Sequence, residues 1–240
     1  QIDLILPNTT WTFTRDTAEA VQFAGPFFVD EEMVMVAAES GITNLSQLNE
    51  RTVCVIDGGP SEVIMNDLAA ASNTIINIIP VGSAEQYRQA YLDGRCVGIA
   101  DGQAALRAMQ ISLPDPDAHR LVSDRLAYSP LSIGTRQGDD HWTDIVRWTL
   151  NVLALAEEAG MVGADIGDLD GETWASQRQR LDTSGIALGL EPGWAIRAVQ
   201  AAGNLGEIYD RSFGPDSDLP IPRGPSALWR DGGMIVPPPL

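Results

Sequence analysis

The chain has 240 residues, 44% of them apolar and 20% charged, which is enough for one large domain or for two lobes with cores of their own. Its net charge of −18, from 33 acidic and 15 basic residues, argues against nucleic acid and anionic lipid as partners. All the basic residues are arginine, which excludes enzymes that need a Schiff-base or P-loop lysine. No apolar run is long enough to span a bilayer, and no signal peptide precedes the first strand-like run, as expected of a processed protein or a fragment.

The first predicted element is a buried strand at residues 2–6, an apolar run. Small polar residues and one arginine follow it, among them Asn8, Thr10 and Arg15. Ligands of α/β folds bind just past strand ends, and hydroxyl groups with a guanidinium suit a carboxylate. This stretch is therefore a candidate carboxylate-binding segment, although a surface turn with an exposed arginine explains it equally well.

A second candidate for anion binding is the Gly-rich turn at residues 57–61. Gly25-Pro26 predicts a turn, residues 32–36 a strand, residues 41–49 a short helix and residues 53–56 a strand. The turn leads from this last strand into a helix predicted at residues 62–71, and the free N–H groups at a helix start bind anions. Gly59 and Ser61 are the candidate ligand residues, but an ordinary strand-to-helix turn is an equal alternative, and the spacing is not that of a dinucleotide or P-loop motif.

A lone carboxylate ends the next predicted strand. Residues 75–81 read as a strand, residues 84–92 as a helix ended by Gly94, and residues 96–100 as a strand that runs into Asp101. Asp101 can bind an ammonium group, or it can cap a helix at residues 102–109, and both roles can coexist.

Two cysteines, Cys54 and Cys96, lie in similar strand-like contexts. Adjacent strands would bring them within reach of a disulfide worth about 4 kcal/mol, which would imply an oxidising compartment. Two free buried thiols are the alternative. With only His119 and His141 besides these cysteines, no metal-ligand spacing occurs, so we expect no metal site.

The remaining elements are mostly helical. Residues 126–135 predict a strand whose Pro130 places it at an edge or at a crossing between lobes. Residues 139–159 predict a long amphipathic helix, residues 172–181 a marginal one, and residues 192–203 a helix that continues through 207–209. The tail from residue 212 is either an ordered wrap or a flexible end.

Strands alternate with helices throughout, which predicts an α/β fold with mainly parallel sheets. Residues 37–129 form one self-contained block, and residues 1–36 with 130–240 would form a second lobe, with a cleft between the two. A carboxylate-binding segment together with an ammonium-binding Asp101 describes a site for an α-amino acid.

Several motifs resemble one known family. They are residues 8–12 (NTTWT), 52–55 (TVCV), 94–96 (GRC), 138–149 (GDDHWTDIVRWT), 203–209 (GNLGEIY) and 223–229 (RGPSALW). Together they resemble the general L-amino-acid-binding proteins of bacterial ABC transporters, within the family 3 extracellular solute-binding proteins. The resemblance covers essentially the whole chain and implies a type II periplasmic binding protein fold, which closes on its ligand by a hinge.

The resemblance also implies roles for individual residues. Arg15 and Thr10 would hold the α-carboxylate, with Gly59 and Ser61 touching the same group, and Asp101 would bind the α-ammonium. Asn8 belongs to the same segment, and Cys54 and Cys96 match cysteines that the family carries. The implied protein is a periplasmic monomer with its signal peptide removed, which binds an L-amino acid and meets a permease without cofactor, metal or nucleic acid.

Three departures from the family pattern shape the expectation. The family's Gly-Arg-Cys-Asp reads Gly94-Arg-Cys-Val97 here, and the step from there to Asp101 is one residue shorter. Family members begin well upstream of Gln1, so we expect an incomplete lobe 1 and weak or absent ligand binding by this chain. Pro60 stands where the family has a threonine, which removes an N–H and a hydroxyl. The alternative functions are a degenerate or sensory amino-acid-binding domain without a transport role, and a dehydratase-like enzyme on the same fold.

Overall fold

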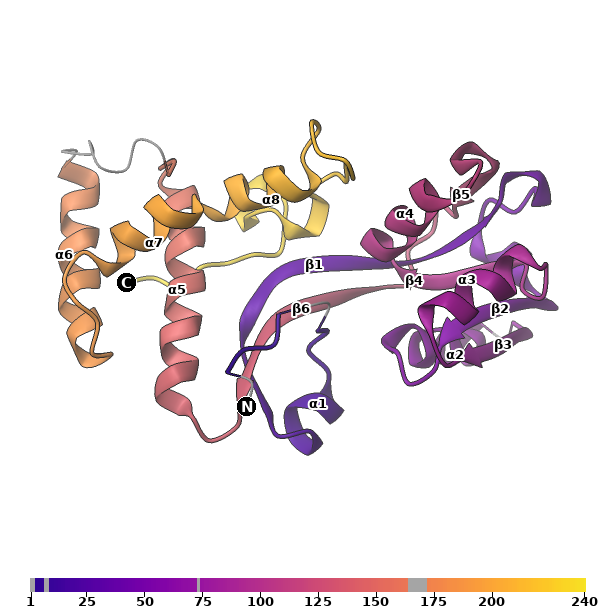
Figure 1. Ribbon diagram of the computed structural model, residues 1–240, viewed down its shortest axis with the longest axis horizontal. Coiled ribbons are helices and arrows are strands. Elements are labelled where there is room, and N and C mark those ends of the chain that lie inside the picture. The colour runs from indigo at the N-terminus through magenta and orange to yellow at the C-terminus, as the bar shows by residue number, and fades with distance from the viewer. Residues whose placement is uncertain (1–2, 7–8, 73, 164–171) are drawn as a thin grey trace. The chain divides into compact units, whose positions relative to one another are not determined.

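The computed structural model describes residues 3–6, 9–72, 74–163 and 172–240, whose helices and strands are drawn in Figure 1. The strands are β1 (Val21–Ala37), β2 (Arg51–Ile56), β3 (Ile76–Val81), β4 (Gly98–Gly102), β5 (His119–Leu121) and β6 (Ala127–Arg136). The α-helices are α1 (Phe13–Ala18), α2 (Pro60–Ser72), α3 (Ala84–Leu92), α4 (Gln103–Ser112), α5 (Asp140–Glu158), α6 (Glu172–Ala187), α7 (Trp194–Ala202) and α8 (Leu205–Phe213). None of the helices in these ranges is long and apolar enough to cross a membrane.

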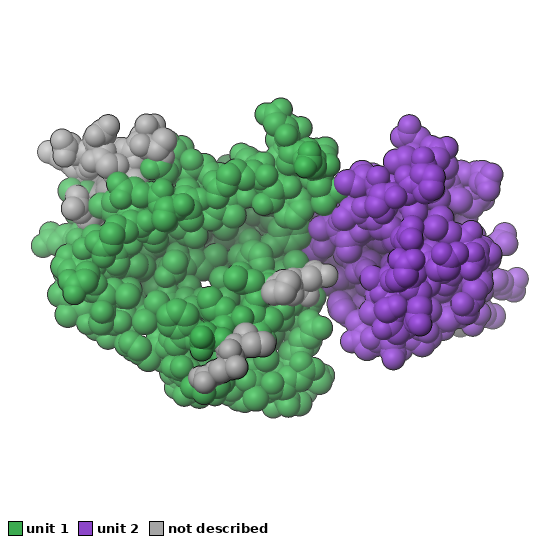
Figure 2. All heavy atoms as spheres, viewed as in Figure 1, with its two compact units in different colours: residues 1–29, 130–240 green, residues 30–129 purple. Residues whose placement is uncertain are grey.

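The chain divides into two compact units, coloured separately in Figure 2. Unit 1 comprises residues 1–29 and 130–240, and unit 2 comprises residues 30–129. The sequence analysis placed the first boundary at residues 36–37. The division lies earlier, at residues 29–30, because the second half of β1 pairs with β4 and β5 and so belongs to unit 2.

The sheet has the strand order β3-β2-β4-β1-β5, and β6 also pairs with β1. The predicted parallel pairing holds for β2 with β3 and for β2 with β4, which helices α2 and α3 connect in the usual βαβ manner. The pairing of β1 with β4 and β5 is antiparallel, so "mainly parallel" is wrong for this half of the sheet. The direction of β1 differs because this strand enters from unit 1 and no helical crossover links it to its neighbours.

Unit 2 has three layers because its strands are buried on both faces. One face packs on α3 and α4 through Met33, Met35, Cys54, Ile99, Tyr87 and Leu106. The other face packs on α2 and on a 3₁₀ turn (Leu45–Leu48) through Val34, Val36, Val53, Val55, Ala100, Met65 and Leu48. Alternate residues of each strand serve opposite faces, so the near-continuous apolar runs of the sequence are the signature of this layer.

The turn predicted at Gly25-Pro26 is wrong, because β1 runs through both residues without interruption. A proline removes a ladder donor from a strand, and it is tolerated where the ladder is already irregular. Here Gly25 has φ +133, and both its N–H and its C=O bond to the Ser132 hydroxyl of β6, at 3.1 and 2.6 Å. A side chain thus substitutes for the regular backbone pairing at this point.

The strand predicted at residues 2–6 is also wrong for its described part. Ile2 lies outside the described residues, and Ile5 makes one isolated antiparallel bridge to Gly134 of β6, with N···O distances of 2.8 and 2.9 Å. Leu6 is 49% exposed. The apolar run therefore lies along an edge strand instead of being covered on both sides.

Unit 1 is built around α5, whose predicted apolar stripe is buried against α7 and α8. The helix predicted to run from residue 192 through 209 is two helices, because Gly203 adopts φ +81 and Asn204 caps a new start at α8. The C-terminal tail is an ordered wrap: Leu228 is fully buried, and the Ser226 hydroxyl accepts from Val29 N at 2.9 Å.

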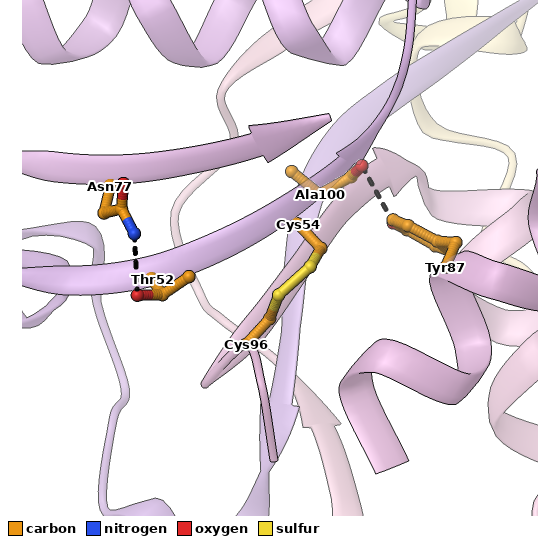
Figure 3. Close-up of a disulfide and its surroundings, with 6 residues drawn as sticks. All are labelled: Thr52, Cys54, Asn77, Tyr87, Cys96 and Ala100. Atoms are coloured by element: carbon orange, nitrogen blue, oxygen red, sulfur yellow. Dashed lines mark hydrogen bonds between the residues drawn. A yellow bond between two sulfur atoms is a disulfide. The ribbon is translucent and has the colours of Figure 1, made fainter. Parts of the chain in front are cut away.

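The predicted disulfide joins Cys54 of β2 to Cys96, just before β4, as Figure 3 shows. The two Cα atoms lie 5.7 Å apart, as expected for residues in adjacent strands. Tyr87 Oη donates to Ala100 O at 2.8 Å beside the disulfide. The disulfide therefore lies inside the layer between the sheet and α3. The alternative of two free thiols is excluded for these cysteines.

We expect the double variant Cys54→Ser/Cys96→Ser to lose about 4 kcal/mol of unfolding free energy, because an open loop of 42 residues regains its entropy in the unfolded chain. Urea denaturation followed by tryptophan fluorescence and far-ultraviolet circular dichroism measures this. Wild-type protein treated with a reductant is the control and should match the variant. An unchanged midpoint would show that the bond contributes nothing to stability.

Candidate functional site

The carboxylate-binding candidates of unit 1 lie where the chain enters α1. Thr12 caps this helix by accepting from Arg15 N at 3.3 Å, and Arg15 Nη1 donates back to Thr10 O at 3.0 Å. Thr10 is buried and bridges Leu131 of β6. One local hydrogen bond thus joins the Arg15 side chain to Thr10; Asn8 lies outside the described residues.

Arg15 keeps most of its hydrogen-bonding capacity. A guanidinium has five N–H donors, and within the described residues only the bond to Thr10 O uses one of them. No carboxylate among the described residues forms an ion pair with it, and the Thr10 hydroxyl makes no hydrogen bond within the same part of the chain. This pair can therefore offer two kinds of donor to an external carboxylate.

The turn that precedes α2 is more fully occupied than the sequence suggested. Gly59 N donates to Ile56 O at 3.0 Å, and the Ser61 hydroxyl donates to Glu32 Oε2 at 2.6 Å. Gly58, with φ +67, gives its N–H to Glu62 Oε2 at 2.8 Å. Among the donors of this turn in the described chain, the backbone N–H of Ser61 makes no hydrogen bond, so it is the group left for a ligand.

Asp101 lies near the carboxyl end of β4. Because β4 is parallel to β2, Asp101 and the turn that precedes α2 lie at the same edge of the sheet. Its Oδ1 accepts from Gly102 N at 2.8 Å, and its side chain is partly exposed. The predicted capping role is wrong: Gly102 is the N-cap residue of α4, and Asp30 Oδ1 from β1 accepts from Ala104 N at 3.3 Å. A residue distant in sequence satisfies the helix start, which leaves Asp101 available.

Three carboxylates gather at this edge of unit 2: Asp30, Glu32 and Asp101. The first two are 4% and 2% exposed, and none of the three forms an ion pair with a described residue. Glu32 accepts from two serine hydroxyls, those of Ser61 and Ser129, the second at 2.5 Å. Negative charge therefore accumulates without a cation among the described residues to balance it.

Burial governs the protonation of this cluster. It raises the pKa of Asp30 to about 7, against the opposing hydrogen bonds from Ala104 and Glu31 and with help from the charges of Glu32 and Asp101. Burial likewise raises the pKa of Asp101 to about 6, opposed by the Gly102 N–H and assisted by Glu32. Desolvation and the same two charges, Asp101 and Glu32, raise the pKa of Tyr87. A cation brought to this edge would lower the pKa of these acids.

Asp30, Glu32 and Ser129 were not predicted from the sequence. A signal was present, because Asp30 and Glu32 interrupt an apolar run that is otherwise buried, and an acid inside such a strand requires partners. The partners themselves were not readable, since Ser61 and Ser129 lie 29 and 97 residues from Glu32.

Comparisons with known proteins identify relatives of the chain. No protein-family model matches the chain. The general L-amino acid-binding periplasmic protein AapJ of Rhizobium johnstonii is 33% identical over the whole chain, which covers 72% of that relative. The glutamate/glutamine/aspartate/asparagine-binding protein BztA of Rhodobacter capsulatus is 29% identical with the same coverage.

A solved structure is also similar. An ABC transporter periplasmic binding protein from Brucella ovis, with glutathione bound, aligns with a TM-score of 0.90 and 32% identity over 99% of this chain and 76% of its own. Its likeness, and a weaker one to an arginine-binding protein of T. maritima (TM-score 0.53, 20% identity), define the type II periplasmic binding protein fold. The chain belongs to the periplasmic amino-acid-binding proteins of ABC transporters. The relatives are binding proteins and not enzymes.

We expect Gly102→Ala to destabilise unit 2 by about 1–3 kcal/mol, because the added Cβ would lie 2.3 Å from Asp30 Oδ2 and would push that carboxylate off the α4 N-terminus. Chemical denaturation measures the loss. Gly82→Ala is the matched control, since its Cβ would only meet Gln86 Oε1 at 3.4 Å. Equal stability of the two variants would contradict the close packing of Asp30 on Gly102.

Proposed function

We propose that the chain binds the zwitterion of an L-amino acid, with the weak affinity that the sequence analysis expects, and presents it to the permease of an ABC transporter. The observation that carries this proposal is the unbalanced charge of its two candidate groups: within the described residues, Arg15 has no anionic partner and Asp101 has no cationic one. An α-amino acid carries the two complementary charges.

Arg15 is the proposed partner of the α-carboxylate. A guanidinium binds a carboxylate with two parallel N–H···O bonds, and such charge-assisted bonds are about twice as strong as neutral ones. The hydrogen bond to Thr10 O holds the side chain before the ligand arrives, which reduces the entropy lost on binding. The Thr10 hydroxyl and the Ser61 N–H are further donors for the same group.

Asp101 is the proposed partner of the α-ammonium. It is the partly exposed member of the acidic cluster, whereas Asp30 and Glu32 are buried and already hydrogen-bonded. Those two carboxylates add negative potential behind it, which favours a cation over a neutral amine. We infer that the role is binding without catalysis, because His119 is bonded to Tyr91 and His141 lies in the first turn of α5, both apart from these groups in the sequence and in their contacts.

A panel of compounds tested for binding would identify the preferred ligand side chain. AapJ is named for general L-amino acids, BztA for the acidic amino acids and their amides, and the Brucella protein holds glutathione. Glutathione has a free α-amino acid end, so the same charged groups would recognise it. Neutral, acidic and basic L-amino acids and glutathione therefore form the panel, with the D-enantiomers as negative controls.

We expect Arg15→Ala and Asp101→Asn each to weaken binding of the preferred ligand by roughly 30-fold, or about 2 kcal/mol, because each removes one partner of a charged pair. Isothermal titration calorimetry gives the dissociation constants.

Two surface variants serve as controls. Arg136→Ala removes a 64% exposed arginine of unit 1, and Asp117→Asn removes an exposed acid of unit 2, so neither should change affinity. Retention of full affinity by Arg15→Ala or Asp101→Asn would reject the assigned roles, and binding of no compound by the wild type would reject the proposed function.

We expect affinity to be constant well above pH 6 and to fall towards tenfold per unit below it. The ammonium binds ionised Asp101, whose pKa in the free protein is about 6, so binding lowers this pKa and is opposed by protons as the pH drops. Titration calorimetry between pH 4.5 and pH 8, in buffers of different ionisation enthalpy, measures both the affinity and the released proton. Asp101→Asn should lack the Asp101 inflection; an identical pH profile in that variant would assign the effect to another group.

A further inference from the structure

Glu32 occupies a particular place in the chain path. The chain enters unit 2 at Asp30 and leaves it after Ser129, so Glu32 follows the entry by two residues and bonds to the last residue before the exit. Its other carboxylate oxygen bonds to Ser61 in the first turn of α2, and its backbone O accepts from Leu126 N at 2.7 Å. One residue of β1 thus holds α2 and the departing chain together.

The two serine hydroxyls that donate to the Glu32 carboxylate are not readily replaced by other donors or by water. Each serine hydroxyl has one proton to donate, and both protons go to this carboxylate, at 2.6 and 2.5 Å. Ser61, Glu32 and Ser129 are 4%, 2% and 3% exposed, so water does not substitute for a lost partner without rearrangement. Loss of either hydroxyl leaves a buried acceptor short of one donor.

None of the other ionisable groups around the Glu32 carboxylate is a cation. They are Asp30 on β1, Asp101 on β4 and the Tyr87 hydroxyl on α3, which is engaged with Ala100 O. No cation among the described residues pairs with Glu32. The two serines are therefore the only side-chain donors to Glu32 in the described structure.

We propose that Glu32 is a positioning residue, which through Ser61 and Ser129 couples the ligand-side turn of α2 to the point where the chain leaves unit 2. This inference rests on the proposed function, in which the Ser61 N–H faces the ligand carboxylate. A ligand that fixes this turn also fixes the Ser61 hydroxyl on Glu32, and Glu32 in turn fixes Ser129. The reverse holds by linkage: a change at the exit alters the turn and therefore the affinity.

The coupling can be tested without a ligand by hydrogen–deuterium exchange of the full chain. We expect Ser129→Ala to speed exchange of the backbone amides at residues 58–62 by about fivefold or more, although Ser129 is distant from them in sequence. Ser132→Ala is the matched control, because Ser132 is another fully buried serine of β6 whose hydroxyl bonds to Gly25 of unit 1. It should leave residues 58–62 unchanged and speed exchange near Gly25.

Affinity provides the second measurement. We expect Ser129→Ala to weaken binding of the preferred amino acid by about fivefold or more and Ser132→Ala to leave it within about twofold. Glu32→Gln should in addition lower the pH at which affinity begins to fall, because the negative charge that opposes ionisation of Asp101 is gone, whereas a purely structural role would not move this midpoint.

The outcomes separate the two proposals. Equal exchange at residues 58–62 in Ser129→Ala and Ser132→Ala overturns the coupling even if the wild type binds amino acids. A wild type that binds no amino acid overturns the proposed function, while the exchange measurement still decides whether Glu32 joins α2 to the chain exit.

Discussion

The antiparallel pairing of β1 with β4 determines where Glu32 and Asp101 lie. Its register places Glu32 opposite Gly102 and Met33 opposite Asp101. Because side chains alternate, Glu32 lies on the face that packs on α2, where it meets Ser61, and Asp101 shares the face of Met33, which packs on α3 and α4. A slip of one residue would move each acid to the other face of the sheet and would separate the apolar side chains of β1 from the core residues they pack on. The core residues on both faces therefore enforce the register.

This arrangement carries an energetic cost that a cationic ligand would relieve. Asp30 and Asp101 have pKa values raised from 3.8 to about 7 and about 6, so the folded state holds protons that the unfolded chain has released. Their contribution to stability is present below about pH 4 and is lost as the pH rises through 6 and 7. At neutral pH unit 2 therefore carries buried negative charge without a counterion from the described chain, and this is the basis on which we propose that an ammonium group binds here.

Local patterns predicted the elements whose signals are local. The helices α3 and α5 begin at their capping residues, Ser83 and Asp139, and end near a glycine, because caps and apolar periodicity act within a few residues. Predictions failed where a distant side chain replaced a local rule. Ser132 supports the strand through Gly25-Pro26, and Asp30 caps the helix that Asp101 seemed to cap.

The sequence by itself determined the alternation of strands and helices, the disulfide partners and the family. These follow from short-range periodicity, from the small number of cysteines and from motifs along the chain. Only the tertiary structure decided that β1 is continuous and antiparallel to β4, that the Ser61 hydroxyl is occupied, and that Glu32 joins Ser61 to Ser129. Those contacts join residues tens of positions apart, and no local pattern specifies which buried donor a carboxylate will meet.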